Sequence, residues 1–543
     1  MKIEPVDYAV ISQSMMAVAR EMGAKLVRSA YSSIVRDAKD ASTGIMDASG
    51  AAVAQSDELI PILVNSLSQT FRGCAALYPP ETLTPDDFYI SNHPYEGGQH
   101  LQDIFVFLPI FFDDKLVGFS ASVAHHLDIG GGAPGLNNSA TDFYQEGLVI
   151  PPSRYSLSRD WNGGMFERLV AANVRVPQQT IGDINAQIAA TRVGDRRVRE
   201  LCRKYGAPLV TGVMDEMIGY SERRVRAAIS AVPDGVYHGR DAVDDDGVND
   251  EPLYVEAKVT VSGQNLEVDY EGTSPQVGTN MNAPMASTIS STLSCLKSIL
   301  TEYDVPFNEG ARRAISIKAP LGSLLNPRPP APVRARMEAA YRAYDAVLQA
   351  LSQAVPEMTI APGYDSTVAT CLSHLGENGY QVYLEVHNGG YGASGRADGC
   401  DAVAGPLSNC TNVPVEALDM NFDFFRVVEY RLRPDSAGSG RYRGGLGFVR
   451  TYKILRDNVQ FSIYADRFRI PAQGAFGGEP GQCGKCEVLR GDEVISVSSK
   501  GSIMLRAGDR LVLSTGGGGG YGHASERDPA HIRADAETGL VTA

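Results

Sequence analysis

The chain has 543 residues, of which 43% are hydrophobic, 21% are charged and 8% are aromatic. This composition is that of a globular protein and excludes a disordered, collagen-like or coiled-coil protein. The net charge is −15, from 49 basic and 64 acidic residues, which argues against general binding to nucleic acid or to anionic membranes.

The chain shows no sign of secretion or membrane insertion. Its eight cysteines are scattered and too few for a fold built on disulfides. The opening MKIEPVDYAVISQSMM lacks the basic region and uninterrupted apolar core of a signal peptide. No stretch reaches the ~18 apolar residues that a membrane span needs. We therefore expect a cytoplasmic protein.

The first 130 residues alternate between helical and strand-like patterns. Residues 6–30 predict an amphipathic helix, residues 31–57 short strands around the turn DASG, and residues 58–78 another helix. Residues 86–130 contain the apolar runs IFVFLPIFF and LVGFSASVA between polar turns, which predicts buried strands of one sheet. The first helix places five apolar residues close to one face: Ile11, Met15, Val18, Met22 and Leu26.

Further along, residues 177–230 predict charged helices, and the composition shift at 231–250 predicts a boundary. A strand pair around VEAKVTVSGQNLEVDYEG follows, with SGQN as its turn. Two helices are expected at 283–303 and 333–355, and short strands with glycine turns at 357–520. We predict a multi-domain α+β protein with mixed sheets, helices in the N-terminal half and a strand-rich C-terminal half.

Three domains are expected from these patterns. Residues 1–230 would form an N-terminal domain with the metal and substrate site, and residues 231–356 a middle α+β domain. Residues 357–543 would form the strand-rich and glycine-rich C-terminal domain.

The strongest chemical signal is a concentration of histidines and carboxylates. Four of the nine histidines lie between positions 93 and 126, interspersed with Glu96, Asp103 and Asp128. His100 and Asp103 stand at the start of one apolar run, and a histidine pair ends the next. Antiparallel pairing would bring these ends together. A site of imidazoles and carboxylates suits Zn, Mn or Fe in the divalent state better than Ca or Mg. The alternative is that these residues only cap turns.

The histidine pair raises its own question. His125 and His126 are adjacent, so on a strand their side chains point to opposite faces. Only one of them should bind a metal directly, and the other should support the site or face a substrate.

The glycine-rich stretches give no recognisable nucleotide site. GEPGQCGKC (478–486) departs from the Walker A pattern at Glu479 and Cys486. TGGGGGYG (515–522) predicts either backbone N–H groups that bind an anion or a tight turn after a strand. The absence of a GxSxG motif argues against a hydrolase with a nucleophile elbow.

Several long motifs, in order, resemble the hydantoinase B/oxoprolinase family. They include SNHPYEGGQHLQD, AHHLDIGGGAPG, YQEGLVIPP, NVRVPQQTIGDINAQIAA, EGTSPQVGTNMNAP, RLRPDSAGSGRYRGGLG and TGGGGGYG. The resemblance extends from about residue 5 to 535. It implies the B subunit of an ATP-dependent hydrolase of cyclic amides or imides, of the N-methylhydantoinase, 5-oxoprolinase or caprolactamase type.

In that family ATP is bound by a separate hydantoinase A-type subunit, which phosphorylates the carbonyl oxygen of the substrate, and the B subunit completes ring opening. The resemblance implies a divalent transition metal on Asp40, His100, Asp103 and His125. Asp40 comes from the segment VRDAKDAS.

The roles of other residues stay open at this point. His126, Asp128 or Glu146 would orient or deprotonate the attacking water. His93 stands where the family often has Asp, in Asn92-His93-Pro94, which leaves its role undecided. Two other functions remain: a subunit of an acetone or acetophenone carboxylase, and a non-catalytic scaffold for the A subunit.

Overall fold

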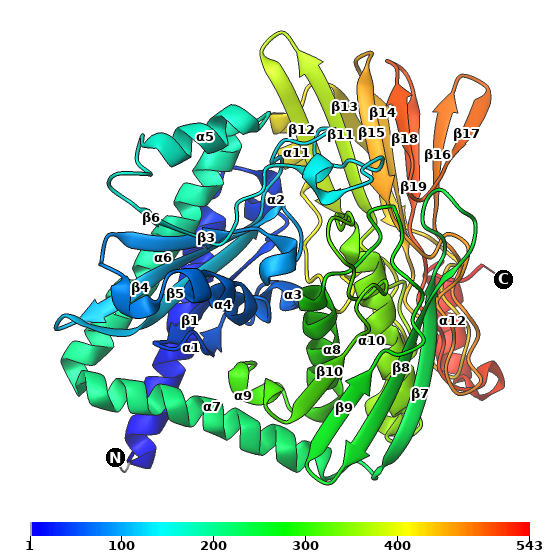
Figure 1. Ribbon diagram of the computed structural model, residues 1–543. Coiled ribbons are helices and arrows are strands. Elements are labelled where there is room, and N and C mark those ends of the chain that lie inside the picture. Colours follow the sequence, from blue (N-terminus) through cyan, green and yellow to red (C-terminus); the bar gives the residue numbers. More distant parts are fainter. Residues whose placement is uncertain (1–2, 543) are drawn as a thin grey trace.

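The structure is a computed structural model that describes residues 3–542 (Figure 1). Its N-terminal part is built on one antiparallel sheet of six strands in the order β2-β1-β5-β4-β3-β6. The strands are β1 (Ala41–Asp47), β2 (Ala52–Gln55), β3 (Asp87–Ser91), β4 (Asp103–Phe112), β5 (Lys115–His125) and β6 (Ser153–Ser156).

Helices cover both faces of this sheet, which explains the uninterrupted apolar run of β4. Ile104 and Val106 pack with Ile188 of the long helix α6, whereas Phe107 contacts Phe71 of α4 on the other face, with ring centroids 5.6 Å apart. The helices of this part are α1 (Pro5–Ser29), α2 (Ser33–Arg36), α3 (Pro61–Val64), α4 (Leu67–Leu77), α5 (Met165–Asn173), α6 (Pro177–Tyr205) and α7 (Ala207–Ile229).

The middle part is a four-stranded sheet in the order β10-β9-β8-β7, against which α10 packs. Only the β9–β10 pair is parallel. Its elements are β7 (Gly235–Val243), β8 (Leu253–Ser262), β9 (Asn265–Asp269), α8 (Met285–Leu300), α9 (Glu309–Arg312), β10 (Ile315–Lys318) and α10 (Arg336–Ser352).

The C-terminal part contains two antiparallel sheets that stand side by side (Figure 1). The first has the order β12-β11-β15-β18 and the second β13-β14-β19-β16-β17. Its elements are β11 (Ala369–Gly376), β12 (Gly379–Val386), α11 (Val415–Asn421), β13 (Phe425–Leu432), β14 (Phe448–Ile454), β15 (Val459–Tyr464), β16 (Lys485–Arg490), β17 (Glu493–Val497), β18 (Ser502–Leu505), β19 (Arg510–Ser514) and α12 (Pro529–Glu537). Five short 3-10 helices complete the described part of the chain: η1 (Pro80–Thr82), η2 (Pro94–Glu96), η3 (Phe143–Glu146), η4 (Pro356–Met358) and η5 (Ala524–Glu526).

The predicted α+β class, with several sheets and a strand-rich C-terminal half, is confirmed. The division into domains at 230 and 356 stays a prediction. The segment 231–250 is more ordered than its composition indicates, because it contains β7 and a buried acidic run. The carboxylate of Asp244 in this run accepts hydrogen bonds from the backbone N–H groups of Phe468 and Ile470.

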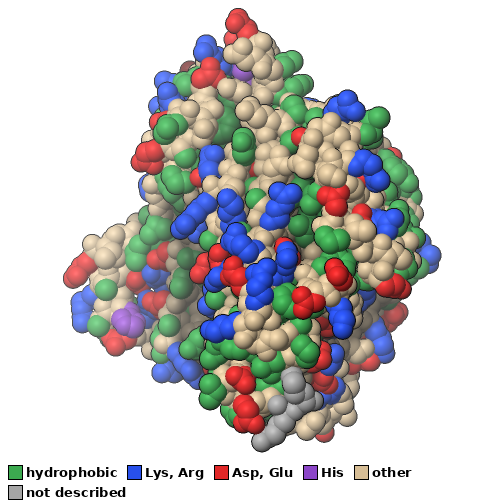
Figure 2. Space-filling model, turned by 90° about the vertical axis from the view of Figure 1, so that its left-hand side faces the viewer, with side chains coloured by type: hydrophobic (Ala, Val, Ile, Leu, Met, Phe, Trp, Pro, Cys, Tyr) green, Lys and Arg blue, Asp and Glu red, His purple; other side chains and the backbone are tan. Residues whose placement is uncertain are grey.

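The charged pattern of 177–230 places its polar residues on the outside of the molecule. Figure 2 shows Lys and Arg side chains, mixed with acidic ones, over the face that carries α1 and α6. Arg197 of α6 lies 3.0 Å from Glu21 of α1 and 2.7 Å from Glu200. Such exposed ion pairs contribute about 0–1 kcal/mol each, so burial of the apolar faces dominates the packing of these helices. Among the described residues, no helix combines the length and apolarity of a membrane span.

The stretch TGGGGGYG is neither an anion site nor an exposed turn. Residues 515–520 are buried outside regular secondary structure, among other glycine-rich segments. The N–H group of Gly518 donates to the carbonyl of Gly445, and that of Gly520 to the carbonyl of Glu479. A Cβ atom on Gly518 would overlap the carbonyl oxygen of Tyr391. The glycines therefore allow backbones to approach closely, and the N–H groups of Gly517–Gly520 already have protein partners.

Candidate metal centre

The predicted meeting of the two strand ends is present in the first sheet. In the antiparallel pairing of β4 with β5, Asp103 lies directly opposite His125. His100 precedes β4 in a turn in which the N–H group of Asp103 donates to the His100 carbonyl. Asp40 precedes β1, and its carbonyl accepts a hydrogen bond from the N–H group of His125. Local sheet pairing thus brings the four predicted ligands to one end of the sheet.

Three of the four side chains form a tight group. His100, Asp103 and His125 each offer a ligand atom, and these atoms lie within 4.8 Å of one another. Nδ1 of His100 lies 3.0 Å from Oδ2 of Asp103, and Nδ1 of His125 lies 3.5 Å from Oδ1 of Asp103. The fourth residue, Asp40, stands at the edge of the group, with Oδ2 3.9 Å from Nδ1 of His125.

Burial sets the protonation states of this group. It holds the pKa of His100 well below its usual range, with help from the nearby Arg336, and lowers the pKa of His125 to about 4. Burial alone would raise the pKa of Asp103, but His100 and Arg336 outweigh it and keep that pKa well below its usual range. Neutral imidazoles beside an ionised carboxylate are the forms that bind a metal ion.

The residues present fit a metal ion. Both ring nitrogens of His100 and Oδ1 of Asp103 are buried and have no hydrogen-bond partner. Buried polar atoms without a partner are rare and costly, because they lose their contacts with water. Their nitrogen and oxygen donors suit a divalent transition metal. The identity of that metal stays open.

Two arginines from distant sequence complete the surroundings. Nη2 of Arg336 lies 2.7 Å from Oδ2 of Asp103, so Oδ1 of the same carboxylate faces His125 without a contact from this arginine. Nη1 of Arg334 lies 3.4 Å from Nε2 of His125. Burial raises the pKa of Asp40 to about 7, with a further contribution from the charge of Asp103. Sequence patterns did not reveal these arginines, because the pattern of residues 333–355 predicted only a helix.

The C-terminal part supplies the opposite wall of the site. A cavity of about 30 Å³ is bordered by Asp40, His100 and His125 on one side and by Tyr464 of β15, Thr367 and Cys410 on the other. Burial raises the pKa of Tyr464, so its hydroxyl is protonated at neutral pH. We name this space the inner cavity. It lies where all three parts of the chain meet.

His126 and Asp128 are placed away from the inner cavity. The ring of His126 turns toward α6, where Nε2 lies 3.0 Å from Oε1 of Gln187. Asp128 accepts hydrogen bonds from the N–H groups of Gly130 and Gly135 and lies 3.1 Å from Nη1 of Arg175. The contacts of Asp128 order the loop GGGAPG, and neither side chain lines the inner cavity.

Glu146 and His93 are also separate from that group. The carboxylate of Glu146 accepts hydrogen bonds from the N–H groups of Val333 and Arg334, and burial raises its pKa to about 8. It therefore holds the segment that places Arg334 beside His125. Nδ1 of His93 accepts a hydrogen bond from the N–H group of Tyr95 at the start of η2.

The histidine pair allows a direct test of the assignment. We expect His125→Ala to lose both metal and activity, because His125 faces Asp103. His126→Ala should keep its metal and change mainly the rate or substrate preference, because His126 faces Gln187. Metal stoichiometry of the two purified variants, measured side by side, checks this. Metal lost from His126→Ala but kept in His125→Ala would reverse the assignment.

The chain belongs to the hydantoinase B/oxoprolinase family, whose defining pattern matches residues 4–524. A protein of Pseudomonas sp. strain NS671, provisionally named as the B component of a D-/L-hydantoinase, is 33% identical, over 100% of this chain and 94% of its own length. The beta chain of caprolactamase from Pseudomonas jessenii is 29% identical, over 99% and 94% of the two chains. Relatives named as B or beta subunits are parts of larger complexes.

Solved structures share the fold over nearly the whole chain. The crystal structure of ATP-dependent caprolactamase from Pseudomonas jessenii matches with a TM-score of 0.92 at 27% identity, covering 100% of this chain and 95% of that one. Nucleotide-free acetone carboxylase matches with a TM-score of 0.89 at 18% identity, covering 99% and 78%. The second likeness is one of fold alone.

Proposed function

We propose that this chain is the B subunit of an ATP-dependent hydrolase that cleaves a C–N bond in cyclic amides or imides, of the hydantoinase, oxoprolinase or lactamase type. The observation that carries the proposal is the buried group of His100, Asp103 and His125 with unpartnered ligand atoms. Family membership and the similarity to components of a hydantoinase and a caprolactamase support it.

Amide resonance makes the carbonyl carbon of a lactam a poor electrophile. Phosphorylation of the carbonyl oxygen by a partner A-type subunit that binds ATP would create an imidate-like phosphate with a good leaving group. A bound divalent metal such as Zn, Mn or Fe supplies Lewis acidity and lowers the pKa of a water molecule.

The chain's own residues prepare this site. His100 and His125 are kept neutral, Arg336 keeps Asp103 ionised, and Asp40 is the proposed fourth ligand. Direct catalytic roles for His126, Asp128 and Glu146 stay predictions. Their contacts support positioning roles, since Glu146 holds the backbone of Arg334 next to the site.

The proposal predicts a division of labour within the complex. This chain alone should show little or no ATP-dependent ring opening, because its sequence contains no Walker A motif. Adding the cognate A subunit should restore turnover of hydantoin, 5-oxoproline or a lactam. ADP and ring-opened product should be measured for each chain alone and for the mixture. Full ATP-coupled turnover by this chain in isolation would contradict the division.

Assays on the same two-subunit complex distinguish the proposed function from the two other candidate functions. A ketone carboxylase subunit would couple ATP to acetone or acetophenone with bicarbonate, and only a likeness of fold favours it. A scaffold for the A subunit would need no metal. Metal analysis of the purified protein would favour that scaffold if no transition metal were bound.

A further inference from the structure

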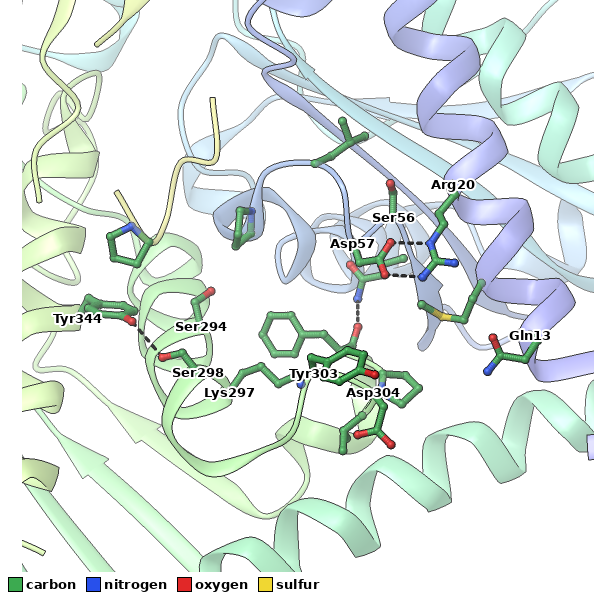
Figure 3. A pocket seen from close by; sticks show the side chains of 18 of the residues that line it. Gln13, Arg20, Ser56, Asp57, Ser294, Lys297, Ser298, Tyr303, Asp304 and Tyr344 are labelled. Atoms are coloured by element: carbon green, nitrogen blue, oxygen red, sulfur yellow. Dashed lines mark hydrogen bonds and ion pairs between the residues drawn. The ribbon is translucent and has the colours of Figure 1, made fainter. Parts of the chain in front are cut away.

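A cavity of about 470 Å³ lies between the N-terminal and middle parts of the chain (Figure 3). Among the described residues, none lines both this cavity and the inner cavity. Two pairs of its polar side chains are bound to each other, as the dashed lines in Figure 3 show. Nη2 of Arg20 lies 2.6 Å from Oδ2 of Asp57, and the hydroxyls of Ser298 and Tyr344 lie 2.9 Å apart. An open hydrogen-bonding group close to the metal centre is found instead in the inner cavity.

Tyr464 forms part of the inner cavity wall that lies opposite the two metal-binding histidines. It is the last residue of β15 and pairs with Ala369, the first residue of β11. Thr367, just before β11, borders the same cavity. Between them, Val368 has a φ of 38°, which a β-branched residue rarely adopts, and strained backbone of this kind is concentrated at functional sites. The adjoining ends of β11 and β15 are therefore shaped around this cavity.

The hydroxyl group of Tyr464 is open. Tyr464 is only 3% exposed, yet its hydroxyl makes no hydrogen bond to any residue that the structure describes. The hydroxyl of a buried tyrosine usually finds a partner. The hydroxyl of Tyr341 on α10 also lacks a partner, but it is sealed within the protein, whereas Tyr464 borders a cavity. Of these two hydroxyls, only that of Tyr464 can reach a molecule in the inner cavity.

The size and polarity of the inner cavity suit water. A buried water molecule needs about 10–15 Å³ and a few polar partners, so a cavity of about 30 Å³ has room for about two. Asp40 and His125 border the cavity beside Tyr464 and add polar side chains. A protonated tyrosine hydroxyl can accept a hydrogen bond from water and donate its own hydrogen elsewhere. Tyr464 thus offers a contact for a water molecule next to the metal-binding group.

We propose that Tyr464 is a catalytic residue that holds the attacking water in the inner cavity. Its hydroxyl oxygen accepts a hydrogen bond from one O–H group of that water. This leaves a lone pair on the water oxygen free to attack the acyl carbon of the phosphorylated ring. The contact orients the water and transfers no proton. The inference rests on the proposed function, because it assigns a role in ring opening, but the binding of the water needs neither ATP nor substrate.

Tyr464→Phe tests this role, because it removes only the hydroxyl oxygen. No described protein group loses a hydrogen bond, so the variant should keep the wild-type metal content and melting temperature. In the assembled complex, the kcat of ring opening should fall roughly 100-fold, the cost of a reacting group that is misplaced by a small distance. KM should stay near its wild-type value, because the hydroxyl contacts the water and not the ring. A wild-type kcat would overturn the proposal.

Tyr341→Phe is the matched control. It removes the same atom from a hydroxyl that is also buried without a partner. Tyr341 lies on α10 and does not line the inner cavity. This variant should keep the wild-type kcat, metal content and melting temperature. An equal loss of kcat in both variants would show that the effect does not arise in the inner cavity, and would overturn the proposal.

A single-turnover reaction of the assembled complex separates water attack from the step that the A-type subunit performs. With Tyr464→Phe, ADP should form at the wild-type rate, because phosphorylation precedes the attack of water. The ring-opened product should appear more slowly than with wild type. A parallel fall in ADP formation and ring opening would assign Tyr464 to the earlier step and would contradict its role in holding water.

Crystal structures of the metal-loaded wild type and Tyr464→Phe, without ATP or substrate, test the binding of water directly. The wild type should hold a water molecule within hydrogen-bond distance of the Tyr464 hydroxyl, and the variant should lack it or hold it elsewhere. No water at this hydroxyl in the wild type, or an unmoved water in the variant, would overturn the proposal. Water bound as expected in a protein whose complex opens no cyclic amide would contradict only the proposed function.

Discussion

Replacing His100 with alanine should yield a folded protein that no longer retains its metal ion and no longer supports ring opening. Loss of the ring removes the 3.0 Å contact of Nδ1 with Oδ2 of Asp103, but that oxygen keeps its hydrogen bond from Arg336. Changes to outer partners of metal ligands already cost roughly 10–100-fold in affinity or activity, and removal of a direct ligand should cost more. Mass spectrometry measures the metal content of the variant, and a thermal melt shows whether it is folded.

His531→Ala is the matched control, because His531 is exposed on α12, more than 400 positions beyond His125 in the chain. It should keep metal, activity and melting temperature. A His100→Ala protein with wild-type metal content and rate would remove His100 from the site. Asp103→Ala is a less selective test, because it also leaves Arg336 buried without its carboxylate partner. Breaking a buried ion pair in this way costs about 3–5 kcal/mol of stability.

Replacing Gly518 with alanine should destabilise the C-terminal part by about 3 kcal/mol or more, above the usual range for overpacked sites. The added Cβ would overlap the carbonyl group of Tyr391, which is backbone and cannot move aside as a flexible side chain could. Gly518 also donates to Gly445 and accepts from Gly438, so a shift would weaken both hydrogen bonds. Soluble yield and thermal unfolding measure the effect.

Gly278→Ala is the control for this substitution. A Cβ atom at Gly278 would have no neighbour within 4 Å, so its effect should stay within about 1 kcal/mol. Equal melting temperatures for Gly518→Ala and wild type would show that the glycine-rich segments tolerate side chains and would contradict the close packing described above.

The sequence predicted the parts of the site that depend on local pairing. Two apolar runs joined by the turn DDK form a hairpin, so the start of one strand must meet the end of the next. That geometry predicts that Asp103 lies near the histidine pair. In the structure, Asp103 of β4 pairs with His125 of β5. The alternation of side chains along a strand likewise separated His125 from His126, which faces Gln187.

The parts of the site that the sequence did not predict are residues far along the chain from the histidine-rich segment. Arg336 lies 233 residues beyond its partner Asp103, and Tyr464 reaches the inner cavity from a different sheet. No periodicity or spacing connects such positions. The composition of 231–250 predicted only a boundary, because nothing in its own sequence reveals that backbone N–H groups of Phe468 and Ile470 bind Asp244. The glycine run predicted either an anion site or a tight turn, because close backbone packing has no side-chain pattern.

The central claim is that this chain completes ATP-coupled ring opening with an A-type partner. Its most direct test is product analysis of the assembled complex, supplied with ATP and either cyclic amides or ketones plus bicarbonate. We predict ADP release matched by ring-opened product from hydantoin, 5-oxoproline or a lactam, and none of it when this chain carries His100→Ala. ATP turnover coupled only to carboxylation of acetone or acetophenone would contradict the account.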